Sequence, residues 1–446
     1  MSFPLSVRAA IFVPMSTLLI TGGRVIDPFS GMDRIADVAI TGGVISAIGL
    51  ALPRSPADEI INAEGCLVTP GLIDPHVHLR EPGNERAETI ASGTRAAASG
   101  GFTTVCCMPN TTPALDNDTM VHFVLYRAQS TGACRVFPVC AVSKARQGEE
   151  LAEIALMARA GACGFSDDGD CIASAALMSR ALSTVKATGK PLMQHCQEPT
   201  MTRGSVMHAG ITSTRLDLAG WPRAAEEIIV ERDIRLNRNI GCAYHVQHIS
   251  SAESVNIVRA ARAAGQPVTA EATPHHLLLT CDLIESSGYD TRYKVNPPIR
   301  EQSDQNAIKL GIADGTITVL GTDHAPHPAE SKDVPFDTAS FGLVGLESAL
   351  SLYYEALVEG NVVDWPRLIA MMTIEPARLC ALDSCGLGKL AVNGPADITV
   401  INPAARWTLA RSELAGRSFN TPFLNRELRA RAVATIVAGV VRWRRN

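Results

Sequence analysis

The sequence predicts an α/β protein: a (β/α)8 barrel of the TIM type, with a small flanking β-sheet domain built from both chain ends. Two observations predict this fold. From residue 69 onward, eight short apolar runs alternate with Ala-rich stretches of helical pattern over roughly 300 residues, as in a (β/α)8 barrel. At both chain ends, β-type runs and glycine-containing turns replace that alternation. We therefore expect residues 1–68 and 390–446 to build the sheet domain and residues 69–389 to build the barrel.

The elements follow in order along the chain. The first β-type runs are residues 18–21, 36–40 and 44–48. The eight barrel strands are expected near residues 72–77, 103–108, 135–140, 162–166, 191–195, 244–249, 268–272 and 317–321. Helical patterns lie between them, among others at residues 85–98, 151–160, 175–188, 223–236 and 252–264. Four β-type runs close the chain, at residues 397–401, 408–409, 433–437 and 440–443.

Composition excludes several classes of protein. The chain has 446 residues, of which 46% are apolar and 19% charged, so it can bury a large core and is not globally disordered. Its net charge of −5 argues against a nucleic-acid-binding protein. No apolar run reaches the ~18 residues of a membrane span. Twelve cysteines without a Cys-x-x-Cys pair favour reduced thiols in a cytoplasmic protein.

The first fourteen residues carry no regular pattern. Their apolar stretch, residues 9–13, is short and ends at Pro14, so it does not fit a secretory signal peptide. Met15 is an alternative start of translation, because the first β-type run begins directly after it.

Histidines gather at the predicted strand ends. His76 and His78 close the first barrel strand, and residues two apart on a strand face the same side. Seven of the eleven histidines lie on or just past such ends: His76, His78, His195, His245, His248, His324 and His327. Active sites of (β/α)8 barrels lie at the carboxyl ends of the strands. The sequence therefore predicts a metal site in the barrel mouth.

Some members of this set have a simpler interpretation. A lone His-x-His motif also suits packed or surface histidines. His245 precedes His248 by three residues, so it should face the other side of the strand and serve packing. Asp167 and Asp168 end the fourth strand and cannot both point inward, so one of them is expected to serve the turn.

Imidazoles together with two carboxylates suit a pair of divalent metal ions, with Zn²⁺ favoured and a carboxylate between them. Such a pair would provide a hydroxide nucleophile at neutral pH and polarise a carbonyl. A serine or cysteine nucleophile is then not required, and we expect Cys196 to be buried rather than catalytic.

The strand-end sequences resemble the amidohydrolase superfamily, and within it the dihydroorotase family. The motifs that carry this resemblance are Asp74-Pro75-His76-Val77-His78-Leu79-Arg80-Glu81-Pro82-Gly83, Gly100-Gly101-Phe102-Thr103-Thr104-Val105, Met108-Pro109-Asn110-Thr111, Phe165-Ser166-Asp167-Asp168-Gly169, Val295-Asn296-Pro297-Pro298 and Thr322-Asp323-His324-Ala325-Pro326-His327. The resemblance covers nearly the whole chain. It implies the reversible cyclisation of N-carbamoyl-L-aspartate to L-dihydroorotate in pyrimidine biosynthesis, in the long bacterial-type branch.

The resemblance also implies a ligand set. Many relatives bridge two metals with a carboxylated lysine at the end of strand four, whereas the long branch uses the second of two paired aspartates, here Asp168. One metal would be held by His76, His78, Asp168 and Asp323, and the other by Asp168, His195 and His248. In this family the aspartate at the position of Asp323 also transfers the proton.

Arg80 should face the same mouth as His78, where its guanidinium can bind a carboxylate of an anionic substrate. The alternative is a surface ion pair with Glu81 or Glu85. Asn296, before two prolines, could serve a turn only. The resemblance implies substrate contacts at His78, Arg80, Asn110, Asn296, His327, Phe341 and Gly342.

Two other functions stay open. One is a hydantoinase- or allantoinase-type hydrolase of cyclic amides. The other is a non-catalytic dihydroorotase-like subunit of aspartate transcarbamoylase. We expect a small-molecule substrate, no nucleic acid, no membrane and a homo-oligomer; an association with aspartate transcarbamoylase rests on the resemblance alone.

Overall fold

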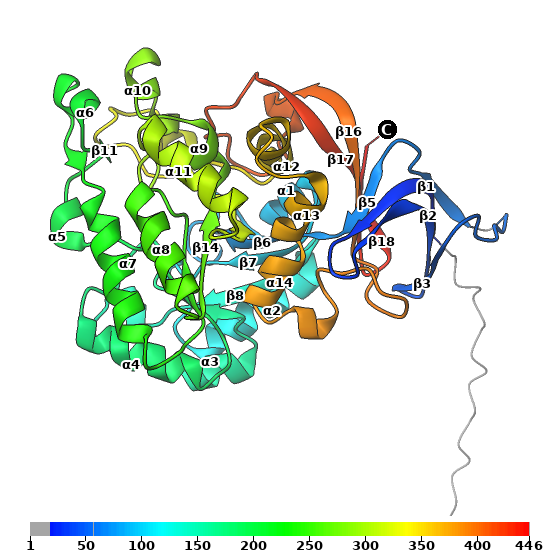
Figure 1. The fold of residues 1–446 in the computed structure, drawn as a ribbon, viewed down its shortest axis with the longest axis horizontal. Helices are drawn as coiled ribbons and strands as arrows, with labels where there is room; N and C mark the ends of the chain where they lie inside the picture. Colours follow the sequence, from blue (N-terminus) through cyan, green and yellow to red (C-terminus); the bar gives the residue numbers. More distant parts are fainter. Residues whose placement is uncertain (1–17, 57, 446) are drawn as a thin grey trace, which may run out of the picture.

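The computed structural model describes residues 18–56 and 58–445, so the segment before Met15 lies outside the described residues. Figure 1 shows a barrel of strands and helices beside a sheet in which the blue amino-terminal strands and the red carboxyl-terminal strands lie together. The predicted fold class is confirmed: a (β/α)8 barrel with a flanking sheet built from both chain ends.

The barrel strands run parallel in the order β15-β14-β13-β10-β9-β8-β7-β6. Their bounds are β6 Leu72–Val77, β7 Phe102–Cys107, β8 Arg135–Cys140, β9 Gly164–Phe165, β10 Leu192–Gln194, β13 Tyr244–Val246, β14 Val268–Ala272 and β15 Val319–Leu320. The ends of this sheet meet where the His78 amide donates to the His324 carbonyl at 2.9 Å. All eight predicted strand positions are confirmed. Several strands are shorter than predicted: β13 ends three residues earlier, and β9 and β15 are shorter at both ends.

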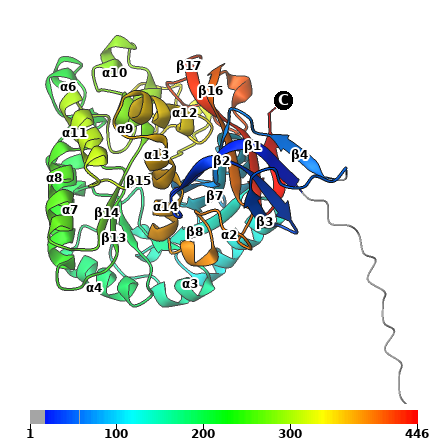
Figure 2. The ribbon, with the colours of Figure 1, turned by 45° about the vertical axis from the view of Figure 1, so that its right-hand side comes forward.

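Helices cover the outside of the barrel (Figure 2). The longer ones are α1 Ile90–Gly100, α2 Asp118–Thr131, α3 Ile154–Ala160, α4 Ala175–Lys186, α7 Ala224–Asn237, α8 Ala252–Ala263, α11 Gln302–Ala313, α13 Trp365–Met372 and α14 Ile374–Leu379. The shorter elements are η1 Lys144–Arg146, α5 Pro199–Thr202, α6 Ile211–Arg215, α9 Pro274–Leu278, α10 Leu283–Ser286, η2 Thr291–Tyr293, η3 Ala329–Ser331, α12 Ala349–Tyr353, η4 Tyr354–Glu359, η5 Asp383–Cys385 and η6 Arg411–Glu413. A two-stranded sheet, β11 Met207–His208 with β12 Gly220–Trp221, lies apart from the barrel sheet.

The first predicted helix, residues 85–98, begins too early. In the structure Thr89 caps the helix, since its side chain accepts from the Ser92 amide, and α1 starts at Ile90. The residues before Thr89 form turns in the barrel mouth instead. The predictions for α4, α7 and α8 agree with the structure to within two residues at each end.

The flanking sheet joins distant parts of the chain in the order β18-β17-β16-β5-β1-β2-β3, with β4 paired to β1. Its strands are β1 Leu18–Asp27, β2 Met32–Thr41, β3 Val44–Gly49, β4 Glu59–Asn62, β5 Leu67–Pro70, β16 Ile398–Thr408, β17 Glu427–Val437 and β18 Val440–Arg444. The predicted runs 397–401 and 408–409 are not separate strands. The first lies at the start of β16 and the second at its end. An irregularity in the pairing between Asn402 and Arg406 hides the alternation there.

Barrel and sheet domain share a buried contact. The hydroxyl of Thr435 on β17 donates to the Ala98 carbonyl at 2.7 Å, and that of Thr399 on β16 donates to the Gly101 carbonyl at 2.6 Å. Both contacts fix the end of α1 and the start of β7 against the sheet. Within the described residues, none of the helices is long and apolar enough to cross a membrane.

Candidate metal centre and active site

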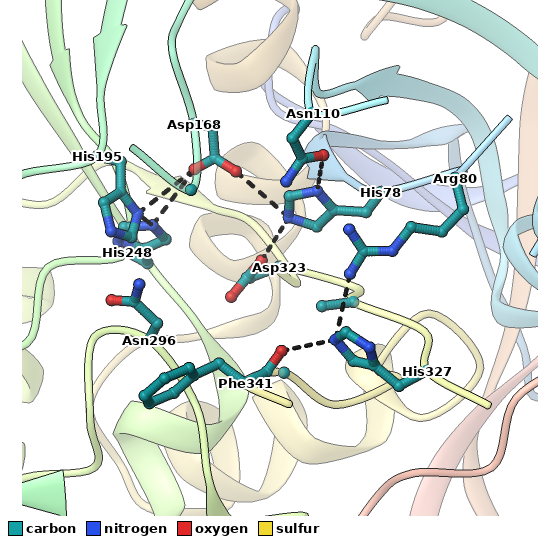
Figure 3. A pocket seen from close by; sticks show the side chains of 13 residues that line it. His78, Arg80, Asn110, Asp168, His195, His248, Asn296, Asp323, His327 and Phe341 are labelled. Atoms are coloured by element: carbon teal, nitrogen blue, oxygen red, sulfur yellow. Dashed lines mark hydrogen bonds and ion pairs between the residues drawn. The ribbon is translucent and has the colours of Figure 1, made fainter. Parts of the chain in front are cut away.

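The predicted site residues meet in one cavity at the carboxyl ends of the barrel strands (Figure 3). The cavity has a volume of about 230 Å³. It is lined by His78, Arg80, Asn110, Asp168, Gly169, His195, His248, Asn296, Asp323, Ala325, His327, Phe341 and Gly342. His76 lies fully buried next to this wall. Residues from strand ends far apart in sequence are therefore brought together as the resemblance implies.

Asp168 lies at the centre of the histidines. Its Oδ1 is 3.3 Å from His76 Nε2 and 3.6 Å from both His195 Nδ1 and His248 Nε2. Its Oδ2 is 3.4 Å from His78 Nε2. The two carboxylate oxygens thus face different imidazoles, which is the arrangement a bridging ligand needs.

Two groups of candidate ligands overlap at His76. His76, His78 and Asp323 bring one ligand atom each within 4.8 Å of one another, and so do His76, Asp168 and His248. Asp323 Oδ1 lies 2.9 Å from His78 Nε2 and 3.6 Å from His76 Nε2.

The sixth predicted ligand, His195, lies beside the second group, next to Asp168 and His248. His195 Nδ1 lies 2.8 Å from His248 Nε2, so two ring nitrogens point at the same small volume. These nitrogens and Asp168 Oδ1 could face one ion.

Each of three imidazoles has its other nitrogen occupied by an acceptor. His76 Nδ1 lies 2.5 Å from Glu271 Oε1, and His78 Nδ1 lies 2.8 Å from Asn110 Oδ1. His195 Nε2 lies 2.8 Å from Gln197 Oε1. When these nitrogens donate, the opposite nitrogens present lone pairs to the centre, which is the usual support for a metal-binding histidine.

Two buried polar atoms in the centre have no hydrogen-bond partner among the residues that the structure describes: His76 Nε2 and Asp168 Oδ1. Such unpaired buried atoms are rare in folded proteins and costly. A divalent cation between an imidazole nitrogen and a carboxylate oxygen would satisfy both. The donor set, imidazoles with carboxylates, also suits Zn²⁺. The residues present therefore fit a metal centre.

The electrostatics agree with a cation-binding site. Burial alone would raise the pKa of the Asp168 carboxyl, but His76, His195 and His248 outweigh it and hold that pKa well below its usual range. The pKa of Asp323 is likewise held below its usual range, because His78 and His76 outweigh the effect of burial. Both carboxylates are therefore ionised at neutral pH.

Three site residues have a backbone conformation that residues other than glycine rarely adopt. The φ angles are +60° at Arg80, +32° at His248 and +47° at Asp323. Each follows the end of a barrel strand. Strained conformations of this kind concentrate at functional sites, where the surrounding structure holds them.

Arg80 supplies positive charge on the side of the cavity away from His195 and His248 (Figure 3). Its Nε donates to the Pro326 carbonyl at 3.2 Å. Burial lowers the pKa of its guanidinium to about 10, so it stays charged at neutral pH. Among the described residues no carboxylate lies within ion-pair distance of Arg80.

The alternative of a surface ion pair for Arg80 is therefore wrong. Glu81 accepts instead from the Ile90 amide at 2.8 Å and from Arg127 Nε at 2.6 Å. Glu85 accepts from the Gly83 amide at 2.9 Å. Both carboxylates are turned away from the cavity.

Of the remaining predicted substrate contacts, His327 lies beside Arg80, with its Nε2 3.4 Å from Arg80 Nη2, and Asn296 lies near His248 (Figure 3). Asn296 Nδ2 donates to Gln197 Oε1 at 3.1 Å, and its Oδ1 is buried with no hydrogen-bond partner in the described part of the chain. His327 Nε2 lies 2.6 Å from the Phe341 carbonyl. Burial and the nearby Arg80 and Lys332 lower the pKa of His327 to about 3, so its ring is neutral at pH 7.

Other residues singled out in the sequence serve packing. Asp167 accepts from the amides of Val142 at 2.8 Å and Ser143 at 3.0 Å, so it fixes the turn. His245 turns away from the cavity toward Thr269 Oγ1 and Glu271 Oε2, at 2.8 and 3.1 Å. Both agree with the structural roles expected for them.

Comparison with known proteins adds an independent observation. A family model described as dihydro-orotase-like matches residues 65–254. The dihydroorotase of Trichlorobacter lovleyi is 44% identical over 424 residues, which cover 95% of this chain and 98% of that protein. That of Pelotomaculum thermopropionicum is 46% identical over 424 residues, with 95% and 98% covered. The chain belongs to the dihydroorotase family.

Solved structures with the same fold carry other names. An L-hydantoinase (dihydropyrimidinase) from Arthrobacter aurescens superposes with a TM-score of 0.85 at 23% identity, covering 96% of both chains. A D-hydantoinase (dihydropyrimidinase) from Thermus sp. has a TM-score of 0.81 at 26% identity, with 96% and 95% covered. The dihydroorotase family thus shares its barrel and flanking sheet with these cyclic amide hydrolases.

Two supporting residues of this dihydroorotase-family site were missed in the sequence. Glu271 contacts both His76 and His245, and Gln197 accepts from both His195 and Asn296. A signal existed for Glu271, since it is the single carboxylate in the apolar run of β14. Gln197 follows strand five in a loop, where no periodicity indicates its direction.

Proposed function

We propose that this chain is a dihydroorotase, which interconverts N-carbamoyl-L-aspartate and L-dihydroorotate in pyrimidine biosynthesis. The choice of an anionic substrate rests on one observation. The partly buried guanidinium of Arg80, which has no carboxylate partner among the described residues, faces a cavity that also holds the metal-binding groups. Both reactants are anionic, and a carboxylate would neutralise this charge through a bidentate contact.

We propose two divalent ions, Zn²⁺ in the simplest case, with Asp168 between them. One would be held by His76, His78, Asp168 and Asp323, the other by Asp168, His195 and His248. When bound, such ions lower the pKa of water and polarise an amide carbonyl, so they supply the nucleophile and the electrophilic assistance.

Asp323 is the group that would move the proton. Its Oδ1 faces His78, while its Oδ2 accepts no hydrogen bond from the described residues and so can exchange a proton with a reactant. In hydrolysis of the ring amide, Oδ2 would take the proton of the attacking water and give it to the leaving ring nitrogen. In cyclisation, the same oxygen would take the proton of the ureido nitrogen and give it to the side-chain carboxylate oxygen that leaves as the ring amide forms.

The other side chains would bind and orient the substrate. Asn110 uses its Oδ1 on His78, which leaves its Nδ2 to donate to an anion. Asn296 Oδ1 accepts no hydrogen bond within residues 18–56 and 58–445, so it can accept from a ring or ureido N–H. His327, Phe341 and Gly342 form the cavity wall next to Arg80 (Figure 3).

A substrate panel tests this proposal. Purified, metal-replete protein is assayed with L-dihydroorotate, hydantoin and allantoin, and its metal content is measured in parallel. We expect dihydroorotate to be hydrolysed with by far the highest kcat/KM. Faster hydrolysis of hydantoin or allantoin would favour the alternative enzyme. A metal-replete protein without activity on all three would favour the non-catalytic subunit. The homo-oligomer, the cytoplasmic location and the association with aspartate transcarbamoylase stay predictions.

A further inference from the structure

A segment of the flanking domain reaches into the barrel mouth. Residues 417–421 lie between η6 and β17, in the carboxyl-terminal part of the chain. Ser418 Oγ donates to the Ala87 carbonyl at 2.7 Å, and the Arg417 amide donates to Glu88 Oε2 at 3.3 Å. The segment therefore contacts the turns that follow β6, the strand that carries His76 and His78. We call residues 417–421 the mouth segment.

Asn420 of the mouth segment contacts the part of the cavity wall that contains His327 and Gly342. Its Nδ2 donates to the carbonyls of Ala325 and Gly342, both at 3.0 Å. Its Oδ1 accepts from the His327 amide at 3.1 Å, and its backbone carbonyl accepts from the Val344 amide at 3.0 Å. The side chain is buried, at 6% exposure. Both N–H donors and the oxygen of the Asn420 side-chain amide are thus used. They connect two cavity-lining segments, one that contains Ala325 and His327 and one that contains Gly342.

These two segments lie so close together that no side chain fits between them at Gly342. Gly342 has a φ of +124°, and a Cβ placed there would lie 2.6 Å from the Ala325 side chain and 3.3 Å from His327 Nε2. A side chain at position 342 would therefore not fit, and the two backbones are in direct contact: the Ala325 amide donates to the Leu343 carbonyl at 2.8 Å. A planar amide with two donors and one acceptor can join two carbonyls and an N–H across such a gap, whereas a hydroxyl or a carboxylate lacks the second donor.

We infer that Asn420 is a positioning residue for substrate binding: it fixes His327 and the Phe341–Gly342 backbone relative to each other, and so sets the wall that faces Arg80. The inference rests on the proposed function. Asn420 lines neither the cavity nor the metal centre, so it acts through the residues it holds. It also links the flanking domain to the site, since the mouth segment leads directly into β17.

The test compares Asn420→Ala with a matched control, Ser418→Ala. The control removes a buried hydrogen bond of the same segment that ends on Ala87 and leaves residues 325–344 untouched. We expect Asn420→Ala to raise KM for dihydroorotate by about 10- to 100-fold, because small displacements of binding groups cost that much. The kcat should change much less, because the groups that Asn420 holds bind substrate and transition state alike. Metal content should stay unchanged, and Ser418→Ala should keep the wild-type KM.

Hydrogen–deuterium exchange gives a readout that needs no activity. In Asn420→Ala the peptides covering residues 325–344 should exchange faster than in the wild type and in Ser418→Ala, because the His327 amide loses its acceptor. An unchanged KM with unchanged exchange, or an equal rise of KM in the control, would overturn the inference. If the wild type fails on dihydroorotate, the proposed function fails, yet the exchange comparison still decides the role of Asn420. Should the alanine variant not fold, Asn420→Asp keeps the volume and the acceptor, loses both donors, and allows the same comparison.

Discussion

At the residue scale, two adjacent aspartates have different roles in the candidate site. Asp167 and Asp168 are neighbours with the same side chain, yet one accepts from two backbone amides in a turn while the other faces four imidazoles. Strand alternation predicts that only one of them points inward, and the family resemblance selected Asp168. The geometry agrees with that choice. It provides a matched pair of variants at adjacent positions.

Asp168→Ala should lose metal binding and nearly all activity, because it removes the carboxylate that lies between both groups of histidines. Asp167→Ala should keep its metal and lose stability only, by about 1–3 kcal/mol, since it leaves buried amides without their acceptor. Metal content, activity and urea unfolding of both variants check this. The reverse outcome, with metal lost only in Asp167→Ala, would mean that the wrong aspartate was selected.

Asp323→Asn should retain much of its metal but lose about 100- to 10,000-fold in kcat, the usual contribution of a positioned acid–base group. The amide oxygen can still face His78, whereas the amide cannot accept and return a proton. Steady-state kinetics with metal analysis on the same sample provide the measurement. Turnover close to that of the wild type would exclude Asp323 as the proton carrier.

Arg80→Met should weaken substrate binding more than metal binding. Loss of a charged contact in a largely buried pocket costs about 2–5 kcal/mol. Arg86→Met serves as control, because Arg86 lies on the same loop, is exposed and pairs with Glu330. Substrate affinity and metal content are compared in both variants. Equal affinities would show that Arg80 is structural and would remove the main support for an anionic substrate.

At the scale of helices and strands, the sequence correctly predicted those elements whose positions follow from a local apolar periodicity. The eight barrel strands and the helices α4, α7 and α8 follow their apolar patterns closely. Strands β4 and β5 were missed because they are four residues long and owe their conformation to pairing with β1 and, for β5, with β16. The site residues could be predicted because they follow barrel strands, whereas Gln197 and Asn420 lie in loops whose contacts are distant in sequence.

The loop that carries Phe341 depends on a buried lysine. Lys332 Nζ donates to the carbonyls of Ser340, Thr291 and Lys294 at 2.6, 2.9 and 3.3 Å. Burial and the neighbouring Lys294 lower the pKa of Lys332 to about 7, although Asp290 acts in the opposite direction. The folded protein therefore releases this proton at lower pH than the unfolded chain, in which lysine titrates near ~10.4.

Between about pH 7 and pH 10 the unfolded state binds more protons at this position, so the contribution of Lys332 to stability rises with pH in that window. Relative to Lys332→Met, the wild type should gain in its free energy of unfolding from about pH 7 to about pH 9. Urea unfolding of both proteins at the two pH values measures the difference. If the difference in free energy of unfolding stayed constant or fell from pH 7 to pH 9, burial would not lower the pKa of Lys332.

At the scale of the whole molecule, the flanking sheet and the barrel form one structure around the site. Residues from both chain ends pair in one sheet, and its strands β16 and β17 fix α1 and β7. The sequence predicted that the two ends pair. It could not predict that the mouth segment enters the barrel, because the hydrogen bonds of Asn420 join positions 78 to 95 residues apart.

We propose a two-metal dihydroorotase site with Asp168 as the bridging ligand, which unlike a carboxylated lysine needs no carbon dioxide to assemble. Its most direct test is a zinc titration of metal-stripped protein in bicarbonate-free buffer, with dihydroorotate hydrolysis as the readout. We expect activity to return to the same level with and without bicarbonate and to saturate at two zinc ions per chain. A requirement for bicarbonate, or full activity at a single zinc ion, would contradict it.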